Sequence, residues 1–356
     1  MKILQLTFTY GNNMGAMLQA YALNKVLTEM GNDCYFLPFY EKPFEIIKTR
    51  LGLIEKILSF FRKIKGRQYT DEWFKQFNLF LYKHCQFAPY VDLDNLRSIE
   101  NDYDMFLVGS DQVWNVMAFN SEYCLLKWVS ENNKKCSYAA SLGSYSIRMK
   151  NDPVLENIKN FVYISFREKI DYEDAKRNSV SGRLDLDPTF LIDKSHWLEL
   201  TDSKYQYLKD YVCIFGYDKQ SYDFAKKYAK KNGIKIVVVN YFGNHILPGI
   251  KILNPPSPTE LLSVIAYAGC VVTHSYHVFI LCLNLNTQVY LSRDLLRREK
   301  SENRFVTVIG GFGLKNREAK MENIDFTVDW DNFNYQLREQ REESLSYLKR
   351  MTKNDL

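Results

Sequence analysis

The sequence predicts an α/β protein with two doubly wound domains that face one another across a cleft. The chain has 356 residues, more than one hydrophobic core usually organises. Short apolar runs that end in polar turns alternate with helical patterns in both halves, which is typical of parallel sheets covered by helices. We therefore expect domains at residues 1–193 and 194–330, and a charged helix at 331–356 packed over their junction.

The first half opens with a strand at 3–10, a glycine-rich turn and a helix at 16–30. Further elements of this half are expected as strands at 34–39, 104–108, 136–140 and 163–166 and a helix at 71–84. Because ligands bind at the carboxyl ends of strands in such sheets, the polar residues that follow these strands predict a binding edge. The alternative for the glycine-rich turn is a tight turn that binds no ligand.

The second half repeats this alternation. Its strands are expected at 211–217, 235–240, 270–273 and 288–291, and its helices at 221–231, 259–267 and 278–285. The segment 187–191, which joins the halves, has the pattern of a hinge.

Composition indicates an ordinary soluble globular chain, with 46% hydrophobic and 25% charged residues. The seven cysteines are scattered in apolar runs, which favours reduced core residues over a disulfide framework or a zinc site. The sequence shows no signal peptide and no apolar window of roughly 18 residues, so we expect a cytoplasmic protein. The unusual feature is an aromatic content of 15%.

The net charge of +5 is too weak to predict nucleic-acid binding, whereas anionic small ligands or an anionic membrane fit it. A basic amphipathic helix is expected at 50–67. Such a helix could lie peripherally on the inner face of the cell membrane, or pack on its own domain with its charges in solvent.

His277 is the leading candidate for acid–base chemistry. It follows a buried strand at the start of a helix, where backbone N–H groups favour anions, and a histidine exchanges protons near neutral pH. The alternative is a structural hydrogen bond at the helix end. Ser275 could bind a phosphate oxygen or serve only as the helix N-cap.

Arginines provide the candidate anion-binding groups. Arg167 follows a strand, and its guanidinium suits a carboxylate or phosphate, although Glu168 could be its salt-bridge partner instead. Arg293 and Arg304 lie in a basic stretch after the last strand, and solvated surface is the alternative for that stretch. No nucleotide-binding or metal-binding motif is convincing, so we expect no metal site.

Six sequence blocks together resemble the polysaccharide pyruvyl transferase family. They keep the family's order from residue 13 to residue 277, and they read NMGAMLQAYAL from 13, YD at 103 with VGSDQVWN from 108, SYAASLG from 137, SFRE from 165, DPTFL from 187 and THSYH from 273. The resemblance implies a GT-B-like pair of Rossmann-like domains. It also implies transfer of a pyruvyl group from phosphoenolpyruvate to a sugar of a surface polysaccharide or of its isoprenoid-diphosphate-linked precursor, as a ketal.

The resemblance assigns roles to the candidate residues. His277 and Arg167 would be catalytic, and Ser275, Arg293 and Arg304 would bind the donor. The acceptor side would consist of Asn13, Gly15, Gln19, Ser110, Asp111, Gln112 and Trp114, with the indole stacking on the sugar. Tyr276 would be a second platform, for the sugar or for the donor. The family commonly has Gly after the histidine, where this chain has Val278.

Two alternatives stay open. The chain could be a GT-B glycosyltransferase that uses a nucleotide sugar, or a carbohydrate-binding member without catalytic activity. Release of phosphate from phosphoenolpyruvate would distinguish a pyruvyl transferase from both alternatives.

Overall fold

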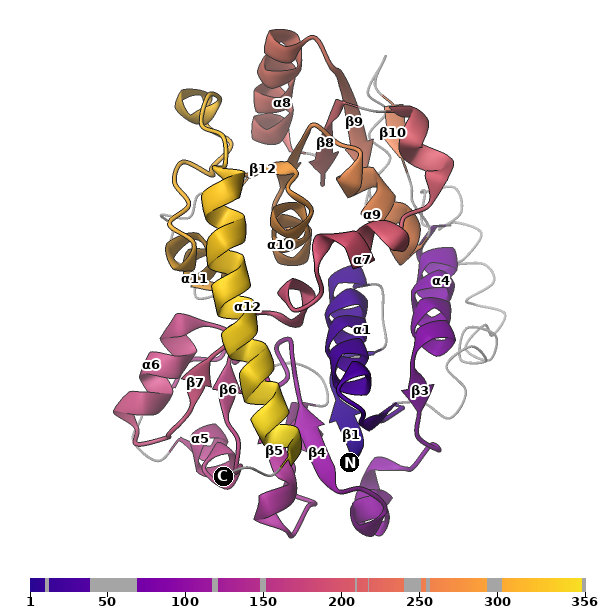
Figure 1. Cartoon of the computed structure of the whole chain (residues 1–356), viewed down its shortest axis with the longest axis vertical. Helices are drawn as coiled ribbons and strands as arrows, with labels where there is room; N and C mark the ends of the chain where they lie inside the picture. Colours follow the sequence, from indigo (N-terminus) through magenta and orange to yellow (C-terminus); the bar gives the residue numbers. More distant parts are fainter. Residues whose placement is uncertain are drawn as a thin grey trace, which may run out of the picture.

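The computed structural model describes residues 1–9, 13–38, 69–116, 121–147, 152–208, 210–216, 218–239, 251–253, 257–292 and 303–353. Within these ranges the chain forms two five-stranded parallel sheets with helices and loops packed against them (Figure 1). The prediction of an α/β protein with a parallel sheet in each half is confirmed. The expected basic helix at 50–67 lies outside the described residues.

The first sheet has the strand order β3-β2-β1-β4-β5, and all its strands are parallel. Its strands are β1 (Lys2–Leu6), β2 (Asp33–Phe36), β3 (Gln86–Phe87), β4 (Met105–Val108) and β5 (Lys135–Ser137). The helices of this half are α1 (Met14–Glu29), α4 (Tyr69–His84) and the short α5 (Pro153–Ile158).

The second sheet has the order β10-β9-β8-β11-β12, again with parallel strands. Its strands are β8 (Tyr211–Phe215), β9 (Lys235–Val239), β10 (Lys251–Leu253), β11 (Cys270–Thr273) and β12 (Gln288–Leu291). Its helices are α8 (Lys219–Asn232), α9 (Pro258–Ala266), α10 (Tyr276–Leu285) and α11 (Asn303–Gly311).

Local signals explain where the helices begin and end. The side chain of Asn13 accepts hydrogen bonds from the backbone N–H groups of Gly15 and Ala16 and so caps α1. Asp218 caps α8 in the same way, and Gly233 ends that helix in the left-handed conformation, with φ of 67°. Each signal can be read from the sequence, so these boundaries lie within two residues of the expected ones.

A connecting region joins the two sheets. The small sheet of β6 (Ser165–Phe166) and β7 (Arg183–Leu184) extends the first sheet through isolated bridges, and α6 (Lys169–Arg177) links its two strands. The expected hinge is a short 3-10 helix at Pro188–Phe190, followed by α7 (Lys194–Glu199).

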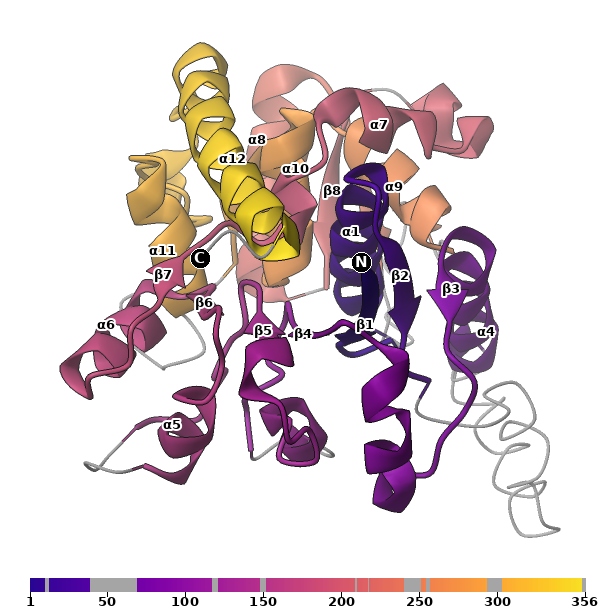
Figure 2. The same cartoon turned by 60° about the horizontal axis from the view of Figure 1, so that its bottom comes forward.

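The helix α12 (Trp330–Lys353) bridges the two halves (Figures 1 and 2). Arg341 donates to the carbonyl oxygens of Phe190 and Ile192 and to the side chain of Asn284 on α10. Two turns on, Tyr347 packs edge-on against Tyr163, next to the first sheet. The helix therefore fixes the connecting region against both halves.

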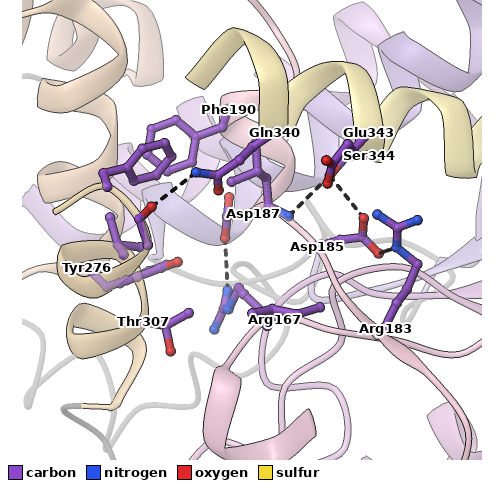
Figure 3. A pocket seen from close by; sticks show the side chains of 15 residues that line it. Arg167, Arg183, Asp185, Asp187, Phe190, Tyr276, Thr307, Gln340, Glu343 and Ser344 are labelled. Carbon is purple, nitrogen blue, oxygen red and sulfur yellow. Dashed lines mark hydrogen bonds and ion pairs between the residues drawn. The ribbon is translucent and has the colours of Figure 1, made fainter. Parts of the chain in front are cut away.

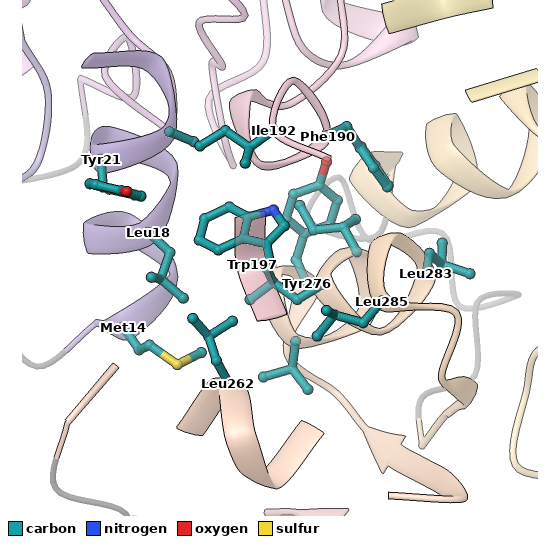
Figure 4. Packing of buried hydrophobic residues seen from close by; sticks show 14 of the residues in the cluster. Met14, Leu18, Tyr21, Phe190, Ile192, Trp197, Leu262, Tyr276, Leu283 and Leu285 are labelled. Atoms are coloured by element: carbon teal, nitrogen blue, oxygen red, sulfur yellow. The ribbon is translucent and has the colours of Figure 1, made fainter. Parts of the chain in front are cut away.

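One hydrophobic core is shared by both halves (Figure 4). Leu18 and Tyr21 of α1 belong to the same buried cluster as Leu262 of α9 and Trp197 of α7. Trp197 is fully buried, and its indole N–H donates to the carbonyl of Thr189 at 3.1 Å. Loss of such a side chain typically costs about 3–5 kcal/mol, so this shared core is a major source of cohesion between the halves.

Among the described residues, no helix is long and apolar enough to cross a membrane.

Candidate active site

The carboxyl ends of strands from both halves deliver charged residues to one buried place. Asp111 follows β4, Arg167 follows β6, and His277 lies in the first turn of α10, which follows β11. Asp187 comes from the connecting region just after β7. The parallel topology of both sheets thus assembles residues that are up to 166 positions apart in sequence (277 − 111).

Arg167 is the centre of this group. Its Nε donates to Glu168 at 2.9 Å, its Nη1 to Asp187 at 3.1 Å, and its Nη2 lies 3.5 Å from Asp111. The arginine side chain is 1% exposed, and the three carboxylate side chains are at most 8% exposed. The guanidinium therefore contacts three buried carboxylates, which is why it can stay charged away from water.

The backbone holds Arg167 at this point. Its N–H donates to the carbonyl of Ala140, in register with the bridge between Ala140 and Phe166.

The guanidinium of Arg167 lies 4.9 Å from the ring centroid of Tyr276, a cation–π distance. Arg304, on α11, lies 5.5 Å from the same ring.

His277 is buried beside this group. Its Nε2 lies 3.7 Å from Oδ2 of Asp187 and has no hydrogen-bond partner among the residues described. Gly15, at the start of α1, packs against the other side of the imidazole, since a Cβ built there would lie 2.1 Å from Nδ1. The site thus uses the N-terminal ends of two helices, one from each half.

Burial and the neighbouring charges shift the pKa values of His277 and Asp111 in opposite directions. Burial lowers the pKa of His277, while Asp187 and Asp111 act to raise it, and the net pKa is below the usual 6.5. Burial would raise the pKa of Asp111, but Arg167 and His277 outweigh it, so this pKa is below normal. At neutral pH the site therefore holds a neutral imidazole beside an ionised Asp111.

Arg304 is the less compensated of the two arginines. Burial and the neighbouring charge of Arg167 lower the pKa of its guanidinium. Its Nε is buried without a hydrogen-bond partner in the described part of the chain. An anion between the two arginines would remove both deficits.

A pocket of about 100 Å³ opens on Arg167 and Asp187 of this cluster (Figure 3). Arg167, Asp187 and Tyr276 form one wall, Thr307 and Phe312 come from α11 and the turn after it, and Gln340, Glu343 and Ser344 of α12 form another. The pocket has room for several water molecules or a small polar ligand.

Several residues expected to bind an acceptor are unsuited to it in this structure. The prediction that Trp114 stacks on a sugar is wrong, because its indole is fully buried between Phe161 and Phe166 and donates to the carbonyl of Cys124. Gln19 and Ser110 are also fully buried. Gln19 donates to the hydroxyl of Thr7 and to a carbonyl of its own helix, and Ser110 donates to the carbonyl of Ala139.

The other acceptor candidates have different positions. Gly15 seats His277, and Asp111 pairs with Arg167. Asn13 is exposed and caps α1, and the amide oxygen of half-buried Gln112 accepts a hydrogen bond from Asn115. Asn13 and Gln112 remain predicted acceptor contacts.

The donor candidates also separate. Arg304 lies at the site, whereas Arg293 is outside the described residues. Ser275 is the N-cap residue of α10, but its side chain makes no capping hydrogen bond. Val278, which stands where the family commonly has Gly, is buried in the shared core. Tyr276 is only 3% exposed, so its ring has little free surface for stacking on a sugar, and its alternative role beside the donor stays a prediction.

Sequence reasoning missed the role of Asp187. The DPTFL block was interpreted as a hinge, although a carboxylate before Pro also serves as a helix cap, and Asp187 does cap the 3-10 helix. Its contacts with Arg167 and His277 depend on strand pairing 20 and 90 residues away, which no local pattern contains. Among the described residues no group of histidines, cysteines and carboxylates could hold a metal ion.

Solved structures show the class of protein that this fold defines. The chain is similar to UDP-GlcNAc 2-epimerase from Neisseria meningitidis bound to UDP-GlcNAc, with a TM-score of 0.54, 11% identity, and coverage of 97% of this chain and 94% of that one. It is also similar to a putative UDP-N-acetylglucosamine 2-epimerase from Listeria monocytogenes, with a TM-score of 0.53, 10% identity, and coverage of 98% and 90%. The fold is therefore a GT-B-like α/β fold.

The family follows from the sequence. The model of the polysaccharide pyruvyl transferase family matches residues 13–291, and this chain belongs to that family. Membership makes it a transferase of the pyruvyl transferase class. A search of curated proteins found no match.

Proposed function

We propose that the protein transfers the pyruvyl group of phosphoenolpyruvate to a sugar of a surface polysaccharide or of its lipid-linked precursor, forming a pyruvate ketal. The observation that carries this proposal is the family match over residues 13–291, a span that includes Asp111, Arg167, Asp187 and His277 of the buried cluster. The two domains at 1–193 and 194–330 would supply the acceptor side and the donor side, with 331–356 packed at their junction.

The proposed reaction begins on the donor, phosphoenolpyruvate. A proton adds to the methylene carbon of phosphoenolpyruvate and gives an oxocarbenium-like centre. A sugar hydroxyl adds to that centre and loses its proton. The bond from this carbon to the phosphate oxygen then breaks, inorganic phosphate leaves, and a second hydroxyl closes the ketal as it loses its proton.

His277 is suited to the proton transfers. A histidine that is neutral at pH 7 can accept a proton from a hydroxyl, and although burial disfavours the imidazolium that results, the carboxylates of Asp187 and Asp111 favour it. We assign it the role of the base for an acceptor hydroxyl. General acid–base catalysis typically contributes about 10²–10⁴-fold in rate.

The arginines are suited to the donor. Phosphoenolpyruvate carries a carboxylate and a phosphate, and Arg304 has a buried Nε–H group without a partner among the described residues. Arg167 would share the anion with Arg304, because their guanidinium groups both lie within about 6 Å of the Tyr276 ring. Ser275 and the backbone at the start of α10 would complete the donor site.

The assay for this function is direct. The protein is incubated with phosphoenolpyruvate and free or lipid-linked oligosaccharides, and we expect release of inorganic phosphate together with a pyruvate ketal on the sugar. His277→Ala should abolish both, with an unchanged far-UV circular dichroism spectrum. His196→Ala, which removes an imidazole bonded to Tyr21 on another surface of α1, should retain them.

Other outcomes identify the alternatives. Thermal stabilisation by nucleotide sugars, without phosphate release from phosphoenolpyruvate, would favour a glycosyltransferase. Binding of oligosaccharide without any turnover would favour a carbohydrate-binding protein. Peripheral contact with anionic membranes through 50–67 is a separate proposal, and sedimentation with anionic vesicles at moderate salt tests it.

A further inference from the structure

Asp187 lies between Arg167, to which the proposed chemistry assigns binding of the donor, and His277, to which it assigns proton transfer. We propose that Asp187 is a positioning residue that holds the imidazole of His277 and the guanidinium of Arg167 in one arrangement, and that keeps the proton of the neutral imidazole on Nε2. The kinetic part of this inference rests on the proposed function, because it requires a turnover assay.

The two oxygens of Asp187 have separate tasks. Oδ2 accepts from Nη1 of Arg167 at 3.1 Å and lies 3.7 Å from Nε2 of His277. Oδ1 accepts from the backbone N–H of Thr189 at 3.1 Å and from its hydroxyl at 2.8 Å. The side chain is fully buried, so both ends of the carboxylate are fixed by protein groups.

The distance of 3.7 Å is longer than a hydrogen bond. Contacts of this kind are often long in a free enzyme and shorten when substrate is bound. Among the described residues, Asp187 is the carboxylate within ion-pair distance of His277 Nε2. A proton on that nitrogen could be donated to Oδ2 when this distance shortens, and Nδ1 would keep its lone pair as the basic site.

A second set of contacts locks Asp187 and His277 to each other. Asn284 follows His277 by seven residues, which places both on one side of α10 two turns apart. Its amide donates to the carbonyl of Thr189 at 2.7 Å and to that of Ile192 at 2.9 Å. These two hydrogen bonds therefore fix the helix that carries His277 against the segment that carries Asp187.

Other charges also surround His277. Asp111 comes from the loop after β4, Arg167 from the end of β6, Arg304 from α11, and the Tyr276 ring is 5.2 Å from the imidazole. The two carboxylates raise the pKa of His277 and the two arginines lower it, with Asp187 having the larger effect of the carboxylates. Removal of the Asp187 charge should therefore lower this pKa further.

The experiment is a titration of the full-length protein labelled with ¹⁵N-histidine and followed by NMR. In the wild type we expect the Nε2–H tautomer of His277 at neutral pH. In Asp187→Asn the pKa of His277 should fall by about one unit or more. Asp193→Asn is the matched control, because Asp193 caps α7 six residues later, and it should leave the titration unchanged.

Two results would overturn the inference. One is the Nδ1–H tautomer in the wild type, which can be observed even if Asp187→Asn does not fold. The other is an unchanged His277 titration in folded Asp187→Asn. Neither result depends on which reaction the protein catalyses.

A kinetic test follows where phosphoenolpyruvate turnover is established. The acid limb of kcat/KM should move to lower pH in Asp187→Asn by the amount seen for the His277 titration. A uniform loss at every pH, with the limb unmoved, would mean that Asp187 is only structural. Absence of turnover in the wild type would contradict the proposed function and leave the NMR result as the test of Asp187.

Discussion

The imidazole of His277 is packed directly against Gly15, a residue 262 positions earlier in the chain (277 − 15). A Cβ at Gly15 would lie 2.1 Å from Nδ1 and 2.5 Å from Cβ of His277, so no side chain fits between α1 and α10 at this point. The glycine in the first block of the sequence is thus required by close approach to a residue in the last block.

Gly15→Ala should therefore displace His277. We expect at least a tenfold loss of turnover and a loss of about 1–3 kcal/mol in the free energy of unfolding, because the added methyl group overpacks a buried contact. Turnover and urea denaturation measure the two effects. Gly310→Ala is the control, since nothing lies near that position and alanine favours its helix. Equal turnover and equal stability of the two variants would show that close packing of Gly15 against His277 is unimportant.

Replacement of Arg167 should be severely destabilising. Arg167→Met leaves Asp111, Glu168 and Asp187 buried without their common cation, and the loss of one partner of a buried ion pair typically costs about 3–5 kcal/mol. Arg167→Lys keeps the charge, but its compact ammonium group lacks the planar fork that reaches the three separate carboxylates, so it should be intermediate in stability. Chemical denaturation checks the order, and a lysine variant as stable as the wild type would show that the fork geometry is unimportant.

Arg341 fixes α12 to the connecting region, a contact that we call the clamp by α12. The clamp predicts that replacing Arg341 and replacing its neighbour Arg338 change the free energy of unfolding by different amounts. Arg341→Met removes hydrogen bonds to two carbonyl groups and an amide, and should cost about 1.5–3 kcal/mol. Arg338 is exposed on the same helix, and Arg338→Met should change the free energy of unfolding by less than about 0.5 kcal/mol. Urea unfolding curves with equal midpoints for both variants would rule out the clamp.

His277 should make folding stability depend on pH. Its pKa is lowered in the folded protein by burial, whereas the unfolded chain binds the proton near pH 6.5. Below about pH 6.5 the unfolded state therefore holds an extra proton, and the free energy of unfolding falls as the pH falls, by at most about 1.4 kcal/mol per unit for this group. His277→Gln should remove this component.

The measurement compares urea midpoints of the two proteins from pH 5 to pH 8. The stability of the wild type relative to His277→Gln should decline on acidification below pH 6.5. A difference that is constant with pH would mean that the imidazole titrates normally in the folded protein.

Sequence patterns predicted the fold better than the site. The strands β8, β11 and β12 are short buried apolar runs followed by turns, so periodicity and turn residues sufficed to place them within two residues. The equally short β5 and β6 overlap the expected strands at 136–140 and 163–166, whereas β3, β7 and β10 were not predicted, because a run of two or three residues has no periodicity of its own.

The site illustrates a different limit. His277, Arg167 and Arg304 were named from residue type and position after a strand, and the structure brings them together. Trp114 was assigned to the surface because it follows a polar loop, yet its indole packs into the core beneath that loop. Burial of a loop residue depends on the elements that cover it, here β6 and the segment before it, and a local pattern does not contain that information.

The hydrogen bond from Ser344 to Asp185 has a consequence for synthesis of the protein. It joins α12 to the strand end two residues before Asp187, across 159 residues of sequence. A nascent chain can fold its first sheet early, since domains generally fold in order during translation. The strand end before Asp187 will nevertheless lack this contact until α12 has been made, so the buried cluster around Arg167 can mature only late in translation.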